Sequence, residues 1–183
     1  MVTTFLPNNW AAIREHYRYH EPAILAERKD EWAIDPYAWD VGMIHFTPIE
    51  SWLWADLREH NAIVYPQYPV GRVFVDFANP RAKVAIECDG AAYHRDHARD
   101  RERDAELIRR GWSVYRISGS DCRTESDEET GAPGAAGLFV RRICQSHEIV
   151  RNCTQAPRET LARASHWMED VKALFAAEAG RRS

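Results

Sequence analysis

Alternating apolar and polar positions mark the middle of this chain. Residues 72–76 alternate so that Phe74 and Asp76 share one face, which predicts a strand that ends at Asp76. Residues 79–81, Asn-Pro-Arg, predict a turn. The apolar run over residues 83–88 then predicts a second strand. The short connection between the two runs indicates an antiparallel hairpin.

Acidic side chains follow both predicted strands. The second run ends in Glu87, Cys88 and Asp89 before Gly90. In a simple hairpin, Asp76 would lie near the start of the second strand and away from Glu87, unless the pairing is staggered or the first strand bends. A buried carboxylate must be protonated, paired or bound to a metal ion. The acids therefore either cap strand ends in water, pair with arginines, or form a site.

Helical patterns flank these strands. A helix is expected over residues 47–60, and a second, highly charged one over residues 96–110, where Gly111 ends it. An early strand is expected over residues 62–68 and a late one over residues 112–117. A strand-helix-strand connection implies a parallel pair with a right-handed crossover, so the sheet is expected to be mixed.

The two ends of the chain are expected to be helical extensions of a core over residues 47–121. In the arm of residues 1–46, Asn9 caps a helix and Pro22 opens another. Residues 122–137 are acidic and then rich in Gly, Ala and Pro, which predicts a flexible loop. Residues 138–183 are expected to hold two helices that pack on the core, the last with an apolar stripe suited to the core or to a homodimer or partner surface. Aromatic residues of the arm either stack on nucleic-acid bases or, as we expect, pack the arm on the core; they are Trp10, Tyr17, Tyr19, Trp32, Tyr37 and Trp39.

Composition narrows the class of protein. The 183 residues are 45% hydrophobic and 28% charged, as in globular proteins, and the net charge of -4 gives no overall basic signature. No apolar run is long enough to cross a membrane, and the first residues do not resemble a secretory leader. The four cysteines show no metal-type spacing, so we expect reduced thiols and a cytoplasmic protein. No Gly-rich phosphate loop or nucleophile elbow indicates a small-molecule enzyme.

The acidic motif carries a family resemblance. Asp76 followed by Glu87-Cys88-Asp89 looks like the metal site of the PD-(D/E)XK nuclease superfamily. The wider pattern is similar to its Vsr-like branch, named after the very short patch repair endonuclease; it comprises VDFA, IECDG, His94, Asp100, Arg103, Asp104, Leu107 and Gly111-Trp112. The resemblance covers residues 47–117 and implies an α/β fold with a restriction-endonuclease-like core, in which helices flank a mixed four-stranded sheet.

The resemblance also implies roles for individual residues. The expected ligands of Mg²⁺ or Mn²⁺, which favour oxygen donors, are Asp76, Glu87 and the Cys88 carbonyl, and Asp89 either adds a further ligand or orients His94. Asp89 stands where the superfamily's commonest motif has a lysine, so His94 is the expected acid/base or water-positioning group. Glu50 has two open roles, since it completes a Thr47 capping box and stands where related helices carry an acid near the metal. Expected nucleic-acid contacts or supporting hydrogen bonds come from Gln67, Arg95, His97, Arg99 and Arg103.

The resulting hypothesis is a magnesium-dependent endonuclease that hydrolyses phosphodiester bonds, and the expected substrate is DNA and not RNA. The alternative is a catalytically weak or inactive subunit of a larger DNA-processing or defence complex, one that binds nucleic acid or protein. The departure at Asp89 motivates an inactive nucleic-acid-binding protein, and the acidic net charge, the aromatic arm and the apolar last helix motivate a protein-binding subunit.

Overall fold

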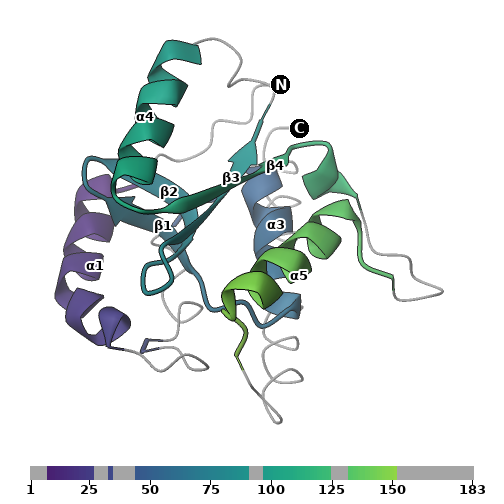
Figure 1. The fold of residues 1–183 in the computed structure, drawn as a ribbon, viewed down its shortest axis with the longest axis horizontal. Helices are drawn as coiled ribbons and strands as arrows, with labels where there is room; N and C mark the ends of the chain where they lie inside the picture. Colours follow the sequence, from purple (N-terminus) through teal and green to yellow (C-terminus); the bar gives the residue numbers. More distant parts are fainter. Residues whose placement is uncertain (1–7, 27–32, 35–43, 91–96, 125–131, 152–183) are drawn as a thin grey trace, which may run out of the picture. The chain divides into compact units, whose positions relative to one another are not determined.

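A four-stranded sheet forms the centre of the described structure. The computed structural model describes residues 8–26, 33–34, 44–90, 97–124 and 132–151, with only the backbone at residues 97–100; all of them belong to one compact unit, residues 1–151. The strands lie in the order β1 (Tyr65–Val70), β2 (Val73–Asn79), β3 (Val84–Asp89) and β4 (Ser113–Ser118) (Figure 1). The first three are antiparallel neighbours, and β3 pairs with β4 in parallel. The predicted α/β fold with a mixed four-stranded sheet is confirmed.

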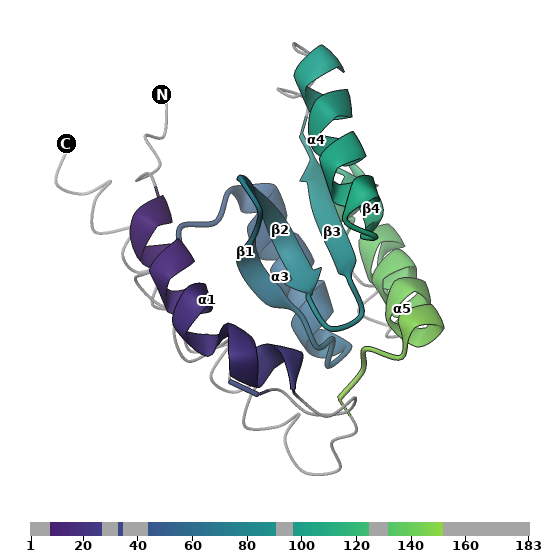
Figure 2. The same cartoon turned by 60° about the vertical axis from the view of Figure 1, so that its left-hand side comes forward.

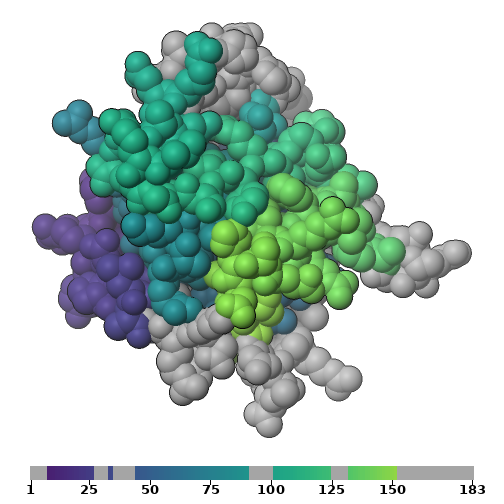
Figure 3. Space-filling model, in the orientation of Figure 1, coloured from purple at the N-terminus to yellow at the C-terminus, as the bar shows by residue number. Residues whose placement is uncertain are grey.

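Helices cover both faces of this sheet. On one face, α3 (Pro48–Glu59) and α5 (Ala135–His147) share a core cluster with Phe77 and Ile86. On the other face, α1 (Trp10–Leu25) and Leu107 of α4 (His97–Arg109) pack with Val75 and Ala85. Figure 2 shows α1 and α5 on opposite sides of the strands, and in the space-filling view α1, α4 and α5 form much of the visible surface (Figure 3).

Helix ends follow the sequence signals closely. Thr47 caps α3 through a complete capping box, in which its side chain accepts from the Glu50 N–H and Glu50 accepts from the Thr47 N–H. Gly111 has a φ of 79° and donates its N–H to the Ile108 carbonyl, which ends the turn after α4. None of the helices among the described residues is long and apolar enough to cross a membrane.

The N-terminal arm differs from the prediction in one respect. Pro22 does not begin a second helix but lies inside α1, which runs without interruption to Leu25. Ile24 is fully buried beyond it, so packing keeps the last turn helical despite the missing proline N–H. Tyr17 is buried and donates its hydroxyl to the Pro66 carbonyl, as expected for a residue that packs the arm on the core. Tyr19 is 80% exposed. Three further aromatic residues of the arm, Trp32, Tyr37 and Trp39, lie outside the described residues.

The segment after β4 is also more ordered than its composition indicated. A short 3-10 helix, η2 (Asp121–Arg123), places Cys122 in the core, and α5 begins at Ala135 within the expected loop of residues 122–137. Ala136 and Gly137 are buried, and this burial favours helix over the loop that small residues suggested. Cys88, Cys122 and Cys144 are buried free thiols. The expected last helix and its partner surface lie outside the described residues.

The prediction that Asp76 ends its strand is wrong. β2 continues for three further residues to Asn79, because Phe77 and Ala78 are both buried and the Asn79 side chain is anchored to the Ile63 carbonyl. The turn occupies residues 80–83, close to the turn predicted at residues 79–81. Asp76 thus lies within the strand, and this changes which residues it faces.

Candidate active site

Asp76 and Glu87 occupy opposing positions of β2 and β3. The ladder pairs Asn79 with Val84 and Phe77 with Ile86, so the next opposing positions are Asp76 and Glu87. Regular pairing stops there, and the Asp76 carboxylate accepts the Cys88 N–H at 2.8 Å. The longer β2 removes the separation that an early strand end would have imposed. The structure therefore brings these two acids together.

Gln67 marks a matching irregularity on the other side of Asp76. The β1–β2 ladder continues on both sides of the position where Gln67 would face Asp76, but this pair is skipped. Gln67 has a φ of 49°, a left-handed conformation that costs energy for a residue with a side chain. Its side-chain amide donates to Glu50 at 3.3 Å. The side chain of Gln67, on a residue with an unfavourable backbone conformation, thus links β1 to Glu50 of α3.

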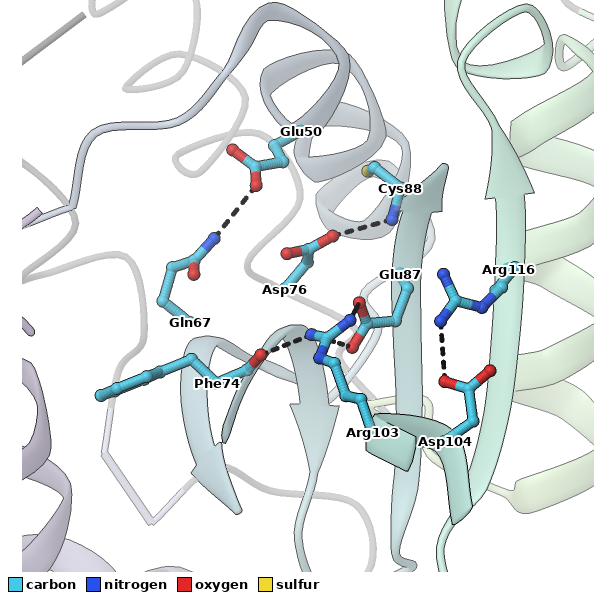
Figure 4. Close-up of polar contacts among 9 residues, drawn as sticks. All are labelled: Glu50, Gln67, Phe74, Asp76, Glu87, Cys88, Arg103, Asp104 and Arg116. Atoms are coloured by element: carbon cyan, nitrogen blue, oxygen red, sulfur yellow. Dashed lines mark hydrogen bonds and ion pairs between the residues drawn. The ribbon is translucent and has the colours of Figure 1, made fainter. Parts of the chain in front are cut away.

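Glu50 caps α3, and its charge also acts on Asp76. One carboxylate oxygen accepts the Thr47 N–H at 2.6 Å and completes the cap of α3. The other faces Gln67, and the charge of Glu50 acts on Asp76. In Figure 4, Asp76 of β2 lies between Glu50 of α3 and Glu87 of β3.

The negative charge around Asp76 is poorly compensated by the described protein groups. Burial raises the pKa of this carboxyl well above its usual range, and the negative charges of Glu87 and Glu50 raise it further. The Cys88 N–H and the positive charge of Arg103 act in the opposite direction and do not offset these effects. The site therefore holds more negative charge than the described protein groups around Asp76 neutralise.

Glu87 is compensated in a different way. Arg103 of α4 donates to both of its carboxylate oxygens, at 2.7 and 2.8 Å, and also to the Phe74 carbonyl at 2.6 Å. Burial raises the pKa of Glu87 above its usual value, and the charge and hydrogen bonds of Arg103 oppose this shift without cancelling it. Of the two roles expected for Arg103, the structure shows the supporting one, because its guanidinium ties α4 to β2 and β3.

One basic residue of this region was missed by sequence reasoning. Arg116 of β4 is in register with Glu87 and donates to Asp104 of α4 at 2.7 Å. An arginine within an alternating apolar strand next to β3 was the available signal, since parallel pairing brings it beside one of the β3 acids.

The remaining predicted residues are only partly described. Asp89 ends β3, and its main-chain carbonyl accepts the Gly119 N–H at 2.8 Å. His94 and Arg95 lie outside the described residues, and only the backbone is described for His97 and Arg99. Their expected roles stay predictions.

Comparison with known proteins places the chain in a family. The family model REase_MTES_1575, which is restriction endonuclease-like, matches residues 50–132. The uncharacterized protein YcjD of Escherichia coli (strain K12) is 34% identical over 82 residues, which are 42% of this chain and 70% of YcjD. The chain belongs to this restriction endonuclease-like family. The family match includes Glu50, Asp76, Glu87 and Arg103, the residues of the acidic site.

A solved structure shows a more distant likeness. The catalytic domain of the homing endonuclease I-Bth0305I aligns with 56% of this chain and 98% of that domain, at 20% identity and a TM-score of 0.43. The assignment to the Vsr-like branch within the restriction endonuclease-like proteins stays a prediction.

A divalent cation fits the Asp76 side of the site. Cys88 directs its N–H toward Asp76, and since the N–H and C=O of a strand residue point to the same side, its carbonyl faces the same gap. Among the residues described, no three His, Cys, Asp or Glu side chains form a group that could hold a metal ion. Mg²⁺ commonly takes only one or two carboxylates and completes its shell with water and phosphate oxygens. Asp76, the Cys88 carbonyl and nearby Glu50 match that requirement, whereas Glu87 is occupied by Arg103.

Proposed function

We propose that this protein is a metal-dependent endonuclease that hydrolyses phosphodiester bonds, with DNA as its substrate. The observation that carries the proposal is the half-buried carboxylate of Asp76, opposite Glu87 and near Glu50, in a member of a restriction endonuclease-like family. Buried acids that raise one another's pKa destabilise a fold unless a cation or proton joins them. A hard cation at a phosphodiester is the use that best explains this arrangement.

Each residue has a defined task in the proposed reaction. A bound Mg²⁺ or Mn²⁺ would lower the pKa of a water molecule and neutralise charge on the scissile phosphate. Asp76 and the Cys88 carbonyl would hold the cation, and Glu50, fixed by Thr47 and Gln67, would orient its outer ligands. His94, by our hypothesis, transfers or positions the proton in place of the superfamily's lysine.

The proposal is tested with the purified full chain. Supercoiled plasmid and single- and double-stranded oligonucleotides of DNA and RNA are incubated with Mg²⁺, Mn²⁺, Ca²⁺ or a chelator. We expect cleavage with Mg²⁺ or Mn²⁺ that is lost with the chelator and in Asp76→Asn. Cleavage that persists undiminished in Asp76→Asn would show that the site is wrong.

A second candidate is a family member that binds nucleic acid without cutting it. It is motivated by Asp89, which stands where the common motif has a lysine and cannot supply a positive charge at the reaction centre. Binding of DNA with no cleavage under any metal condition would favour this candidate.

A further inference from the structure

The ion pair between Arg103 and Glu87 bears on how many cations the site can take. The guanidinium fills both oxygens of the carboxylate, with distances of 2.7 and 2.8 Å. The side chains of Arg103 and Glu87 are only 16% and 3% exposed. A planar guanidinium on a carboxylate in this two-point geometry is among the strongest hydrogen-bonded pairs in proteins.

A third contact fixes Arg103 in place. One of the two Arg103 nitrogens that contact Glu87, Nη2, also donates to the Phe74 carbonyl at 2.6 Å. Phe74 lies two residues before Asp76 on β2. For Glu87 to become a metal ligand, Arg103 would have to leave Glu87, and its charge would then need a new partner. Breaking a buried pair of this kind is costly because it leaves one charge without its partner.

The surroundings reinforce this division of charge. Arg116 stands in register with Glu87 on β4 and acts on it as a second positive charge. Asp76 has no comparable pair among the described contacts; its carboxylate accepts a main-chain N–H and is exposed to the charges of two other acids. The two acids therefore differ in what they can still bind (Figure 4).

We infer that Arg103 is a built-in positive partner that keeps Glu87 from ligating metal, so that the site takes one divalent cation, held at Asp76. Arg103 is thus a positioning residue that acts through Glu87. The inference rests on the proposed function in one respect, namely that the cation binds at Asp76. It departs from the ligand set that the superfamily resemblance implies, in which Glu87 binds the metal directly.

Charge-balanced variants separate the two possibilities. In Glu87→Gln/Arg103→Gln both charges are removed together, so the net charge near Asp76 is unchanged. If Glu87 is not a ligand, Mn²⁺ affinity should stay within about threefold of that of the wild type. Arg103→Gln alone releases the Glu87 carboxylate beside Asp76, and the affinity should rise by about tenfold or more, as expected for one additional nearby negative charge.

The experiment is a calorimetric titration of the full chain with Mn²⁺, with thermal unfolding measured in parallel with and without the ion. We expect one ion per wild-type chain, tighter binding in Arg103→Gln, and near wild-type binding in the double variant. Arg109→Gln removes an exposed arginine of the same helix and should change nothing. Arg103→Lys keeps the charge and should bind Mn²⁺ like the wild type, which covers the case in which Arg103→Gln does not fold.

Three results would overturn the inference: two ions per wild-type chain, a double variant that binds as poorly as Asp76→Asn, or a folded Arg103→Gln that binds no tighter than the wild type. The proposed function fails separately, when Mn²⁺ binds but no nucleic acid is cut. Even if wild-type binding is too weak to measure, the gain in Arg103→Gln remains the deciding observation.

Discussion

Asp76 and Glu87 stand opposite each other on neighbouring strands, yet their surroundings differ. Glu87 is matched by two arginines, of which Arg103 binds both of its oxygens. Asp76 instead receives one main-chain N–H and the repulsion of two acids. A buried ion pair holds elements together, whereas a half-buried acid without a paired cation costs stability unless a proton or a cation binds to it. Under the proposed function, Glu87 supports the fold and Asp76 binds the cation.

Asp76→Asn should have the largest effect. Asparagine keeps an oxygen for the Cys88 N–H but removes the charge that would hold a cation. We expect metal-dependent cleavage to fall by about a thousandfold or more, as for loss of a central electrostatic group. Thermal stability without metal should equal or exceed that of the wild type, because the raised pKa of Asp76 shows that its charge is unfavourable in the fold.

Glu106→Gln is the matched control for that experiment. Glu106 lies on α4 and pairs with Arg109 and Arg110 near the helix end. Removing its charge should leave cleavage within about twofold of wild type, since pairs at exposed positions contribute little. A similar loss of cleavage in both variants would point to net charge instead of the Asp76 site.

Arg103→Gln should have the largest effect on stability. It leaves Glu87, whose side chain is 3% exposed, without its main partner. Loss of one member of a buried ion pair typically costs about 3 kcal/mol or more. Chemical denaturation should show that loss, while Arg109→Gln, which breaks a pair with a 72% exposed arginine, should cost about 0.5 kcal/mol or less. Equal losses would mean that the Arg103 pair contributes no more than a surface contact.

The sequence indicated much of the fold around these two acids. The capping box, the stop at Gly111 and the parallel β3–β4 pair are local or topological signals, and the structure has all three. Candidate acids could be named because charged residues beside buried strands are energetically costly unless they are paired, protonated or bound to an ion. The second of the two roles expected for Arg103, a supporting hydrogen bond, agrees with its contacts to Glu87 and Phe74.

The sequence could not supply the partner of each acid. Whether β2 ends at Asp76 or at Asn79 decides which residues face each other, and the burial of Phe77 and Ala78 that settles it is a tertiary effect. The left-handed conformation of Gln67 is likewise invisible in the sequence, because only packing on both sides holds a glutamine there. Arg116 reaches Glu87 through strand register alone.

Glu50→Gln separates the two tasks of Glu50. Glutamine still accepts the Thr47 N–H, so the cap and the stability should be preserved. The lost charge should lower Mn²⁺ affinity and cleavage by about tenfold. Thr47→Ala should do the reverse, with a loss of about 1 kcal/mol in stability and unchanged Mn²⁺ affinity. If Glu50→Gln binds Mn²⁺ like the wild type, Glu50 is only a capping residue.

The smallest expected effect concerns Asp56, an acid of α3 that lies outside the candidate site and whose negative charge is unfavourable because it is partly buried. Burial, and then the charge of Glu59, raise the pKa of Asp56 from 3.8 to about 6. Between these values the folded state holds the extra proton, so the contribution of Asp56 to stability falls as the pH rises through this window. Asp56→Asn should therefore be more stable than the wild type by about 1 kcal/mol at about pH 7.5, and the two should converge near about pH 4.

Denaturant titrations across that pH range measure the difference, with Glu15→Gln, at an exposed position on α1, as the control that should follow the wild type. A constant difference between Asp56→Asn and the wild type at every pH would mean that shape, not charge, is responsible. Convergence at low pH would show that burial together with the charge of Glu59 makes the Asp56 carboxylate unfavourable in this fold. Asp76 differs from Asp56 in having two acidic neighbours, Glu87 and Glu50, where Asp56 has Glu59, and the proposed cation site depends on that larger negative charge.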